Sequence, residues 1–132
     1  MTTRWRRLGL GAVVPIVIEI ELLRTYLAHD GVYHWFTHYF VGASVALAAM
    51  AVVTLRRRRA VAYPLVWILI GHLYAGLPDL FFMDSVPHQR WQDIFFAHVS
   101  SHFVPGRNLT WAVIFSLALG GYLFAVDRTA AA

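Results

Sequence analysis

Hydrophobic residues form four long runs along the chain, and shorter polar stretches separate them. A helix needs roughly 20 mostly apolar residues to cross the hydrocarbon core of a membrane. The pattern therefore predicts an all-α fold, a four-transmembrane-helix bundle in which residues 1–132 form a single integral-membrane domain. The expected spans cover residues 8–28, 35–55, 60–82 and 109–126.

A longer polar stretch separates the third run from the fourth, and it has a pattern of its own. It opens with Asp84, Ser85 and Pro87, which are typical of helix N-termini. Apolar and histidine side chains then recur at spacings of three and four, namely Trp91, Ile94, Phe95, His98 and His102. This spacing predicts an additional amphipathic helix over about 87–104, lying on the outer face of the membrane.

Composition supports a membrane protein and excludes other classes. The chain has 132 residues, of which 59% are hydrophobic and 14% are charged, and it contains no cysteine. A disordered chain would be more polar, and a disulfide scaffold would need cysteines. A water-soluble globule of this size would leave too much apolar surface unburied.

The arginines predict the orientation in the membrane. All 11 cationic residues are arginine. Three precede the first run, four separate the second run from the third, and one follows the fourth, which places eight of the 11 on one side. By the positive-inside rule we expect a bacterial-type inner membrane protein with both termini in the cytoplasm. Because the arginines lie between apolar runs, the expected partners are membrane lipids, other membrane subunits or a second copy of the chain, and not nucleic acid.

The histidines favour a metal site. Six of the seven histidines lie at or near the predicted outer face. His34 and His38 are four residues apart, as are His98 and His102. Residues at this spacing share one face of a helix, so two imidazoles can bind the same metal ion. We therefore predict all four as metal ligands.

Two acidic residues lie near these histidines. Asp79 follows Pro78 near the outer end of the third run, at about the depth of His38, and it is the fifth predicted ligand. The alternative for Asp79 is that it caps a helix break made by the proline. Asp30 lies four residues before His34 and is a further candidate if the second helix begins early.

Ionisable residues also lie near the middle of the membrane. His72 lies seven residues before Asp79, on the same helix face but about 10 Å deeper. Glu19 in the first run lies at a similar depth, so the two side chains can meet inside the bundle. A buried ionisable residue in a membrane is a functional candidate, because burial in lipid is expensive. We predict Glu19 as the catalytic residue, acting as a general base, a proton relay or a hydrogen-bonded partner of His72.

Short motifs add a family resemblance. The order of His34-Trp-Phe-Thr-His38, Gly76-Leu-Pro-Asp79, His88-Gln-Arg90 and the final histidine pair resembles the small integral-membrane metal-dependent hydrolases of bacteria. The chain departs from that family at Phe81, where a second aspartate is typical, and no Thr-His-Ser follows Arg90. The resemblance implies metal-dependent hydrolysis, and it adds His88 to Asp30 and His72 as further candidate site residues.

These features lead to one main hypothesis and two alternatives. The main hypothesis is a metalloenzyme with an outward-facing His/Asp site, in which a divalent ion activates water to hydrolyse a lipid-linked or amphiphilic substrate. Zinc is the first choice of metal, before iron or copper, and haem comes last. The alternatives are a histidine-box membrane oxidase and an accessory subunit of a larger membrane complex that binds haem or metal for electron transfer.

Overall fold

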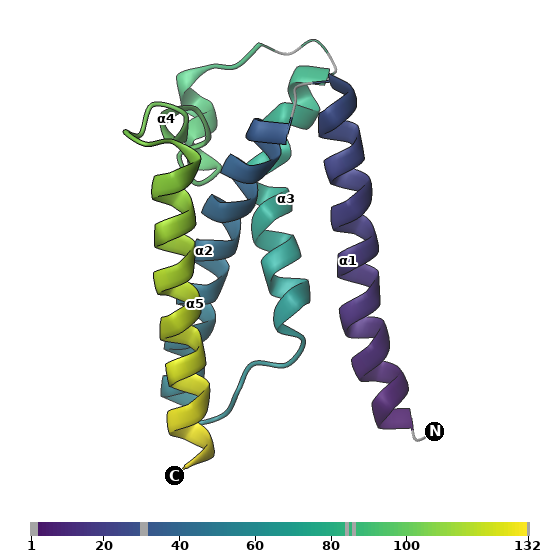
Figure 1. Ribbon diagram of the computed structural model, residues 1–132, viewed down its shortest axis with the longest axis vertical. Coiled ribbons are helices and arrows are strands. Elements are labelled where there is room, and N and C mark those ends of the chain that lie inside the picture. Colours follow the sequence, from purple (N-terminus) through teal and green to yellow (C-terminus); the bar gives the residue numbers. More distant parts are fainter. Residues whose placement is uncertain (1–2, 30–31, 84, 86, 132) are drawn as a thin grey trace.

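A computed structural model describes residues 3–29, 32–83, 85 and 87–131, and all the regular secondary structure in this part of the chain is helical (Figure 1). Four helices are long and two are short. In chain order they are α1 (Thr3–His29), α2 (Val32–Arg57), α3 (Pro64–Met83), the 3-10 helix η1 (Arg90–Ile94), α4 (His98–Ser101) and α5 (Asn108–Ala130).

Three of the long helices can cross a membrane, and the prediction of four spans is wrong. The segments that are long and apolar enough are Tyr33–Arg57, Pro64–Phe82 and Asn108–Ala130. The first helix, α1, contains Glu19, Glu21 and Arg24 within its apolar run, which makes it too polar to count as a span. The Nη1 atom of Arg24 lies 3.2 Å from Glu21 Oε1, and this ion pair is on an exposed face of the helix.

The helix α2 lies at the centre of the bundle and packs against both α3 and α5. Its crossing with α3 is a backbone contact. A Cβ atom added to Gly42 would lie 2.2 Å from the Gly71 carbonyl oxygen, and one added to Gly71 would lie 2.4 Å from the Gly42 oxygen. Small residues allow such close packing of helices in membranes. On the other side, Leu47 and Met50 of α2 pack with Tyr122 of α5.

The connector between α3 and α5 does not form the predicted amphipathic helix over 87–104. It contains the 3-10 helix η1 and the single turn α4, separated by Phe96 and Ala97 with φ angles of 53° and 57°. Residues in this left-handed conformation cannot continue a right-handed helix, so η1 and α4 are separate helices. Consequently Trp91 and Ile94 are 49% and 64% exposed, whereas His98 is buried.

The chain termini and the connector that contains α4 lie at opposite ends of the bundle (Figure 1). Figure 1 shows both chain termini at one end, with α4 and its connector at the other. The helices α1 and α3 run parallel, and the loop from α2 to α3 lies at the end that holds the termini. Most of the histidines therefore gather at the end opposite the termini.

Candidate metal centre

Three histidines from three segments converge on the carboxylate of Asp79. His38 comes from α2, Asp79 from α3, His98 from α4, and His88 from the loop after α3. The Nε2 atom of His38 lies 3.1 Å from Asp79 Oδ2, and the Nε2 atoms of His88 and His98 each lie 3.1 Å from Asp79 Oδ1. His38 and Asp79 are 0% exposed and His98 is 1% exposed. The cluster is thus compact, and its three residues on helices are shielded from solvent.

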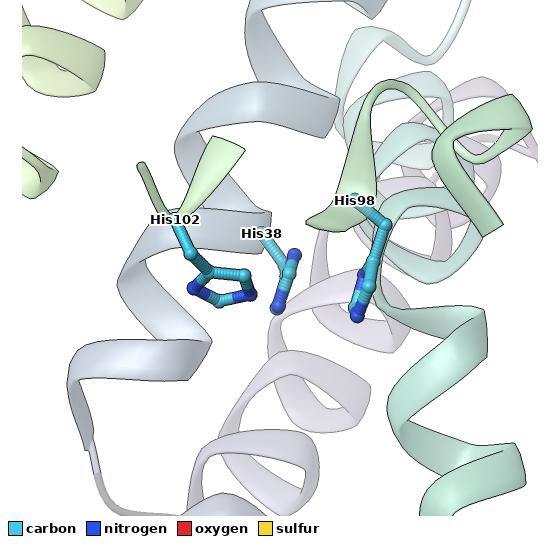
Figure 2. A group of neighbouring side chains, drawn as sticks. All are labelled: His38, His98 and His102. Carbon is cyan, nitrogen blue, oxygen red and sulfur yellow. The ribbon is translucent and has the colours of Figure 1, made fainter. Parts of the chain in front are cut away.

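Two overlapping groups have the spacing that a metal ion requires. One consists of His38, His98 and His102, and the other of Asp79, His88 and His98. Within each group the potential ligand atoms lie within 4.8 Å of one another. Figure 2 shows the first group, with the His38 ring between those of His98 and His102. Nitrogen and oxygen ligands bind zinc at about 2.0–2.2 Å, and both groups, which are mostly buried, could hold a metal ion.

One ring nitrogen of His98 is held by the backbone of α3. Its Nδ1 atom lies 2.8 Å from the carbonyl oxygen of Ala75, and a carbonyl only accepts, so Nδ1–H is the donor. In a neutral imidazole the other nitrogen, Nε2, then carries a lone pair. This Nε2 atom lies 3.1 Å from Asp79 Oδ1 and 3.2 Å from His88 Nε2. A proton or a metal ion at Nε2 would make its contact with the carboxylate favourable.

His38 lacks the hydrogen bonds that a buried histidine normally makes. Its Nε2 atom is close to Asp79, but neither ring nitrogen makes a hydrogen bond, and both are buried. The ring stacks on His98 with a centroid distance of 4.3 Å and an interplanar angle of 7°. Buried polar atoms without partners are rare in folded proteins. Metal coordination would satisfy one of these nitrogens.

Asp79 is oriented by a residue that the sequence analysis missed. The hydroxyl of Tyr26 in α1 donates a hydrogen bond of 2.7 Å to Asp79 Oδ2. Gly76 leaves room for this contact, because a Cβ atom there would lie 2.8 Å from the Tyr26 oxygen. Hydrogen bonds of this kind fix the orientation of a ligating carboxylate.

The structure brings His38, Asp79, His98 and His102 together but leaves the fifth predicted ligand outside. His34 lies beside His102, with a centroid distance of 4.8 Å, and belongs to neither metal-spaced group. His88, a secondary candidate in the sequence, contacts Asp79 directly, and its side chain is 32% exposed. The remaining candidate, Asp30, falls outside the described residues.

The predicted contact between Glu19 and His72 is confirmed. Glu19 Oε2 lies 2.7 Å from His72 Nδ1, while Glu19 Oε1 is buried and has no hydrogen-bond partner. His72 precedes Asp79 by seven residues of α3, which separates them by about 10 Å along the helix. The pair is therefore too far from Asp79 for Glu19 to act directly on a ligand there.

A cavity of about 590 Å³ lies next to the histidines. Its walls include His34, His102, Arg107 and Asn108, so it reaches one member of the metal-spaced groups. The Asn108 amide donates a hydrogen bond of 3.0 Å to the Tyr33 carbonyl and thereby ties the start of α5 to α2. Arg107 supplies a cation that the sequence analysis did not include, because a single arginine after Pro-Gly carries no distinctive signal.

His102, at the boundary between the cluster and the cavity, is neutral near pH 7. Burial, followed by the nearby His38, His34 and His98, lowers the pKa of His102 to about 4. A neutral imidazole retains the lone pair that binds a metal. Its charge state is therefore suitable for a ligand.

Comparison with protein-family models, with curated proteins and with solved structures finds no match for this chain. The short motifs that resemble the bacterial membrane hydrolases are therefore not accompanied by a family match. The interpretation of the site depends on its own geometry, which is a buried set of histidines around one carboxylate.

Proposed function

We propose that this protein is a membrane metalloprotein and that the cluster holds a divalent metal ion. The central ligands are His38, Asp79 and His98, with His88 and His102 as the outer ligands. The observation that supports this most directly is the position of His98, whose Nε2 lies 3.1 Å from Asp79 Oδ1 while its Nδ1 lies 2.8 Å from the Ala75 carbonyl oxygen. A bound metal ion would be held by this nitrogen and this carboxylate together.

Zinc is the proposed ion. The donors are imidazole nitrogens and carboxylate oxygens, and the chain has no cysteine. Zinc accepts this donor set, and catalytic zinc sites combine three such ligands with one open position. Imidazole also binds iron and copper. Haem fits less well, because parallel rings 4.3 Å apart leave no space for a macrocycle between His38 and His98.

The proposed reaction is hydrolysis of an amphiphilic substrate. A bound zinc ion would supply an activated water molecule near neutral pH. The cavity of about 590 Å³ next to His102 is within the size range of ligand sites, and Arg107 in its wall can bind an anionic group. The site lies at one end of apolar helices, so a lipid-linked substrate could reach it from the membrane.

Within this proposal Glu19 acts as part of a proton relay. A cavity of about 10 Å³ is lined by both Tyr26 and His72, and this is close to the space that one water molecule occupies. A water there would connect the hydroxyl that contacts Asp79 to the imidazole that contacts Glu19. This arrangement suits a relay better than a general base, given the separation along α3.

Metal analysis tests the proposal directly. We expect protein purified in detergent without a His-tag to contain zinc and to show no Soret absorption band. His38→Ala and Asp79→Asn should lose the metal, whereas His72→Ala should retain it because His72 belongs to neither metal-spaced group. Full metal content in His38→Ala would refute the ligand set, and a Soret band would favour the haem alternative.

The hydrolytic activity needs its own assay. Chromogenic esters and phosphodiesters with a long alkyl chain are suitable probes. Turnover by wild-type protein that disappears in Asp79→Asn and after treatment with a chelator is the expected result. A zinc-loaded protein without turnover on either class of probe would overturn the hydrolase proposal and leave the metal site standing.

The orientation is also a proposal, with the histidine cluster on the outer side of a bacterial-type inner membrane. The arginine distribution supports it, and so does the position of both termini at the opposite end of the bundle (Figure 1). Since the chain has no cysteine, each introduced thiol is unique. An impermeant reagent should label Phe103→Cys in intact cells and Asp127→Cys only after lysis. The reverse pattern would overturn the orientation.

A further inference from the structure

A second, larger cavity lies at the other end of the bundle, where α2 ends and the chain turns into α3. It has a volume of about 770 Å³, and its walls are mainly apolar, including Met50, Val53 and Trp67. The apolar segment of α2 ends at Arg57 and that of α3 begins at Pro64. The cavity thus lies at the depth where apolar helix meets polar loop, which is the level of lipid headgroups.

Two of the four consecutive arginines line this cavity. They are Arg57 and Arg59, whereas Arg56 and Arg58 are not part of its walls. No acidic residue lines the cavity, and in the described ranges neither Arg57 nor Arg59 takes part in an ion pair. Two arginines therefore border an apolar cavity without a protein counter-ion.

The local backbone explains this division of the arginines. Arg58 has a φ of 48°, and the Arg59 amide donates to the Thr54 carbonyl at 3.3 Å. This is a Schellman-type helix end, in which glycine usually occupies the left-handed position. An arginine there costs conformational energy that glycine would avoid. With this turn, Arg57 and Arg59 both lie in the wall of the cavity.

We propose that this cavity binds one anionic phospholipid, with its phosphate between Arg57 and Arg59 and its acyl chain along the apolar wall. Guanidinium groups recognise phosphate through paired hydrogen bonds. Basic pockets between membrane helices are suited to anionic headgroups. An apolar wall would contribute nothing to free phosphate, and the paired arginines would contribute little to a zwitterionic lipid. The combination selects an amphiphile with a net negative head.

The test is native mass spectrometry of the full chain in detergent, titrated with phosphatidylglycerol or with phosphatidylcholine of the same acyl chains. We expect one tightly bound phosphatidylglycerol and weaker binding of phosphatidylcholine. The double variant R57Q/R59Q should lower the affinity for phosphatidylglycerol about 25-fold, since each arginine near an anionic lipid contributes about fivefold.

The matched control is R56Q/R58Q, which removes the same charge from the same run. We expect it to lower the affinity by less than about threefold, because these side chains do not line the cavity. Equal losses in the two double variants would show general electrostatic attraction and would overturn the proposal. Circular dichroism of both variants should show unchanged helix content.

A cavity-filling variant separates a lipid from a free anion. Ala49 lines the cavity, so Ala49→Phe should occupy the acyl-chain position while keeping all four arginines. The expected result is loss of bound phosphatidylglycerol, with no displacement of lipid from wild-type protein by 10 mM inorganic phosphate. Unchanged lipid binding in Ala49→Phe, or displacement by phosphate, would reduce the site to an anion site and overturn the lipid proposal.

Discussion

Replacing His38 with leucine tests whether His38 is a metal ligand or an ordinary core residue. Both ring nitrogens of His38 are buried without hydrogen bonds, and an unsatisfied buried polar group costs about 1–3 kcal/mol. Leucine removes this penalty while filling a similar volume. Asp79 keeps its hydrogen bond from Tyr26, so the substitution leaves no unpaired carboxylate. In metal-free protein we expect the free energy of unfolding to change by less than about 1 kcal/mol or to rise.

The metal-loaded protein should respond in the opposite way. A ligand that binds only the folded state stabilises it by about 4 kcal/mol at a free concentration 1,000-fold above its dissociation constant. For a chain of this size that corresponds to a rise in Tm on the order of 10 °C. His38→Leu removes a central ligand, so this metal-dependent rise should disappear.

The assay is thermal unfolding in detergent, followed by circular dichroism, with and without zinc. His72→Leu is the matched control. It leaves Glu19, whose side chain is 17% exposed, without its partner and should cost about 3 kcal/mol with or without metal. Its zinc-dependent rise in Tm should persist. If His38→Leu instead loses several kcal/mol in metal-free protein, and zinc does not stabilise the wild type, His38 is a structural core residue.

Three further predictions concern other parts of the molecule. Glu19→Gln should keep the metal but slow hydrolysis by about 10²-fold if the relay operates; unchanged turnover would assign Glu19 to structure alone. Gly42→Leu should separate α2 from α3, because even a Cβ atom would meet Gly71 at 2.2 Å, and should lower both Tm and metal content. The lowered pKa of His102 means that protonation favours unfolding, so Tm should fall as the pH drops from about 6.5 towards 4, less steeply in His102→Gln.

Of the four membrane spans predicted from the hydrophobic pattern, three agree with helices that are long and apolar enough to cross a membrane, and the first does not. The expected spans 35–55, 60–82 and 109–126 lie largely within α2, α3 and α5. The first run does form a helix, but the expected span required Glu19, Glu21 and Arg24 to face other helices or water, and these residues make the helix too polar to count as a span. Mean hydropathy reports how apolar a segment is on average. It does not report whether charged groups on that helix find partners.

The candidate site was predictable where local spacing determines geometry and unpredictable where a loop does. A single helical turn is enough to place His98 and His102 on the same face, and α4 supplies that turn although it ends at Ser101. The longer periodicity that predicted Trp91 and Ile94 on the same face fails, since the left-handed backbone at Phe96 and Ala97 changes the phase of the pattern. His88 reaches Asp79 from irregular backbone, and no periodic rule places such a residue.

The register between α1 and α3 links the two long-range contacts between these helices. Glu19 pairs with His72, and Tyr26 pairs with Asp79; both contacts join residues 53 positions apart. Two parallel helices that meet once will meet again seven residues later on the same faces, because seven residues make nearly two turns. Matching Glu19 to His72 by depth therefore implies that residue 26 lies opposite residue 79, a step that the sequence analysis did not take. A tyrosine at that position supplies the hydroxyl that orients the carboxylate, and Gly76 supplies the space for it. The buried pair in mid-bundle and the metal-spaced cluster are consequently held in register by the same helix packing.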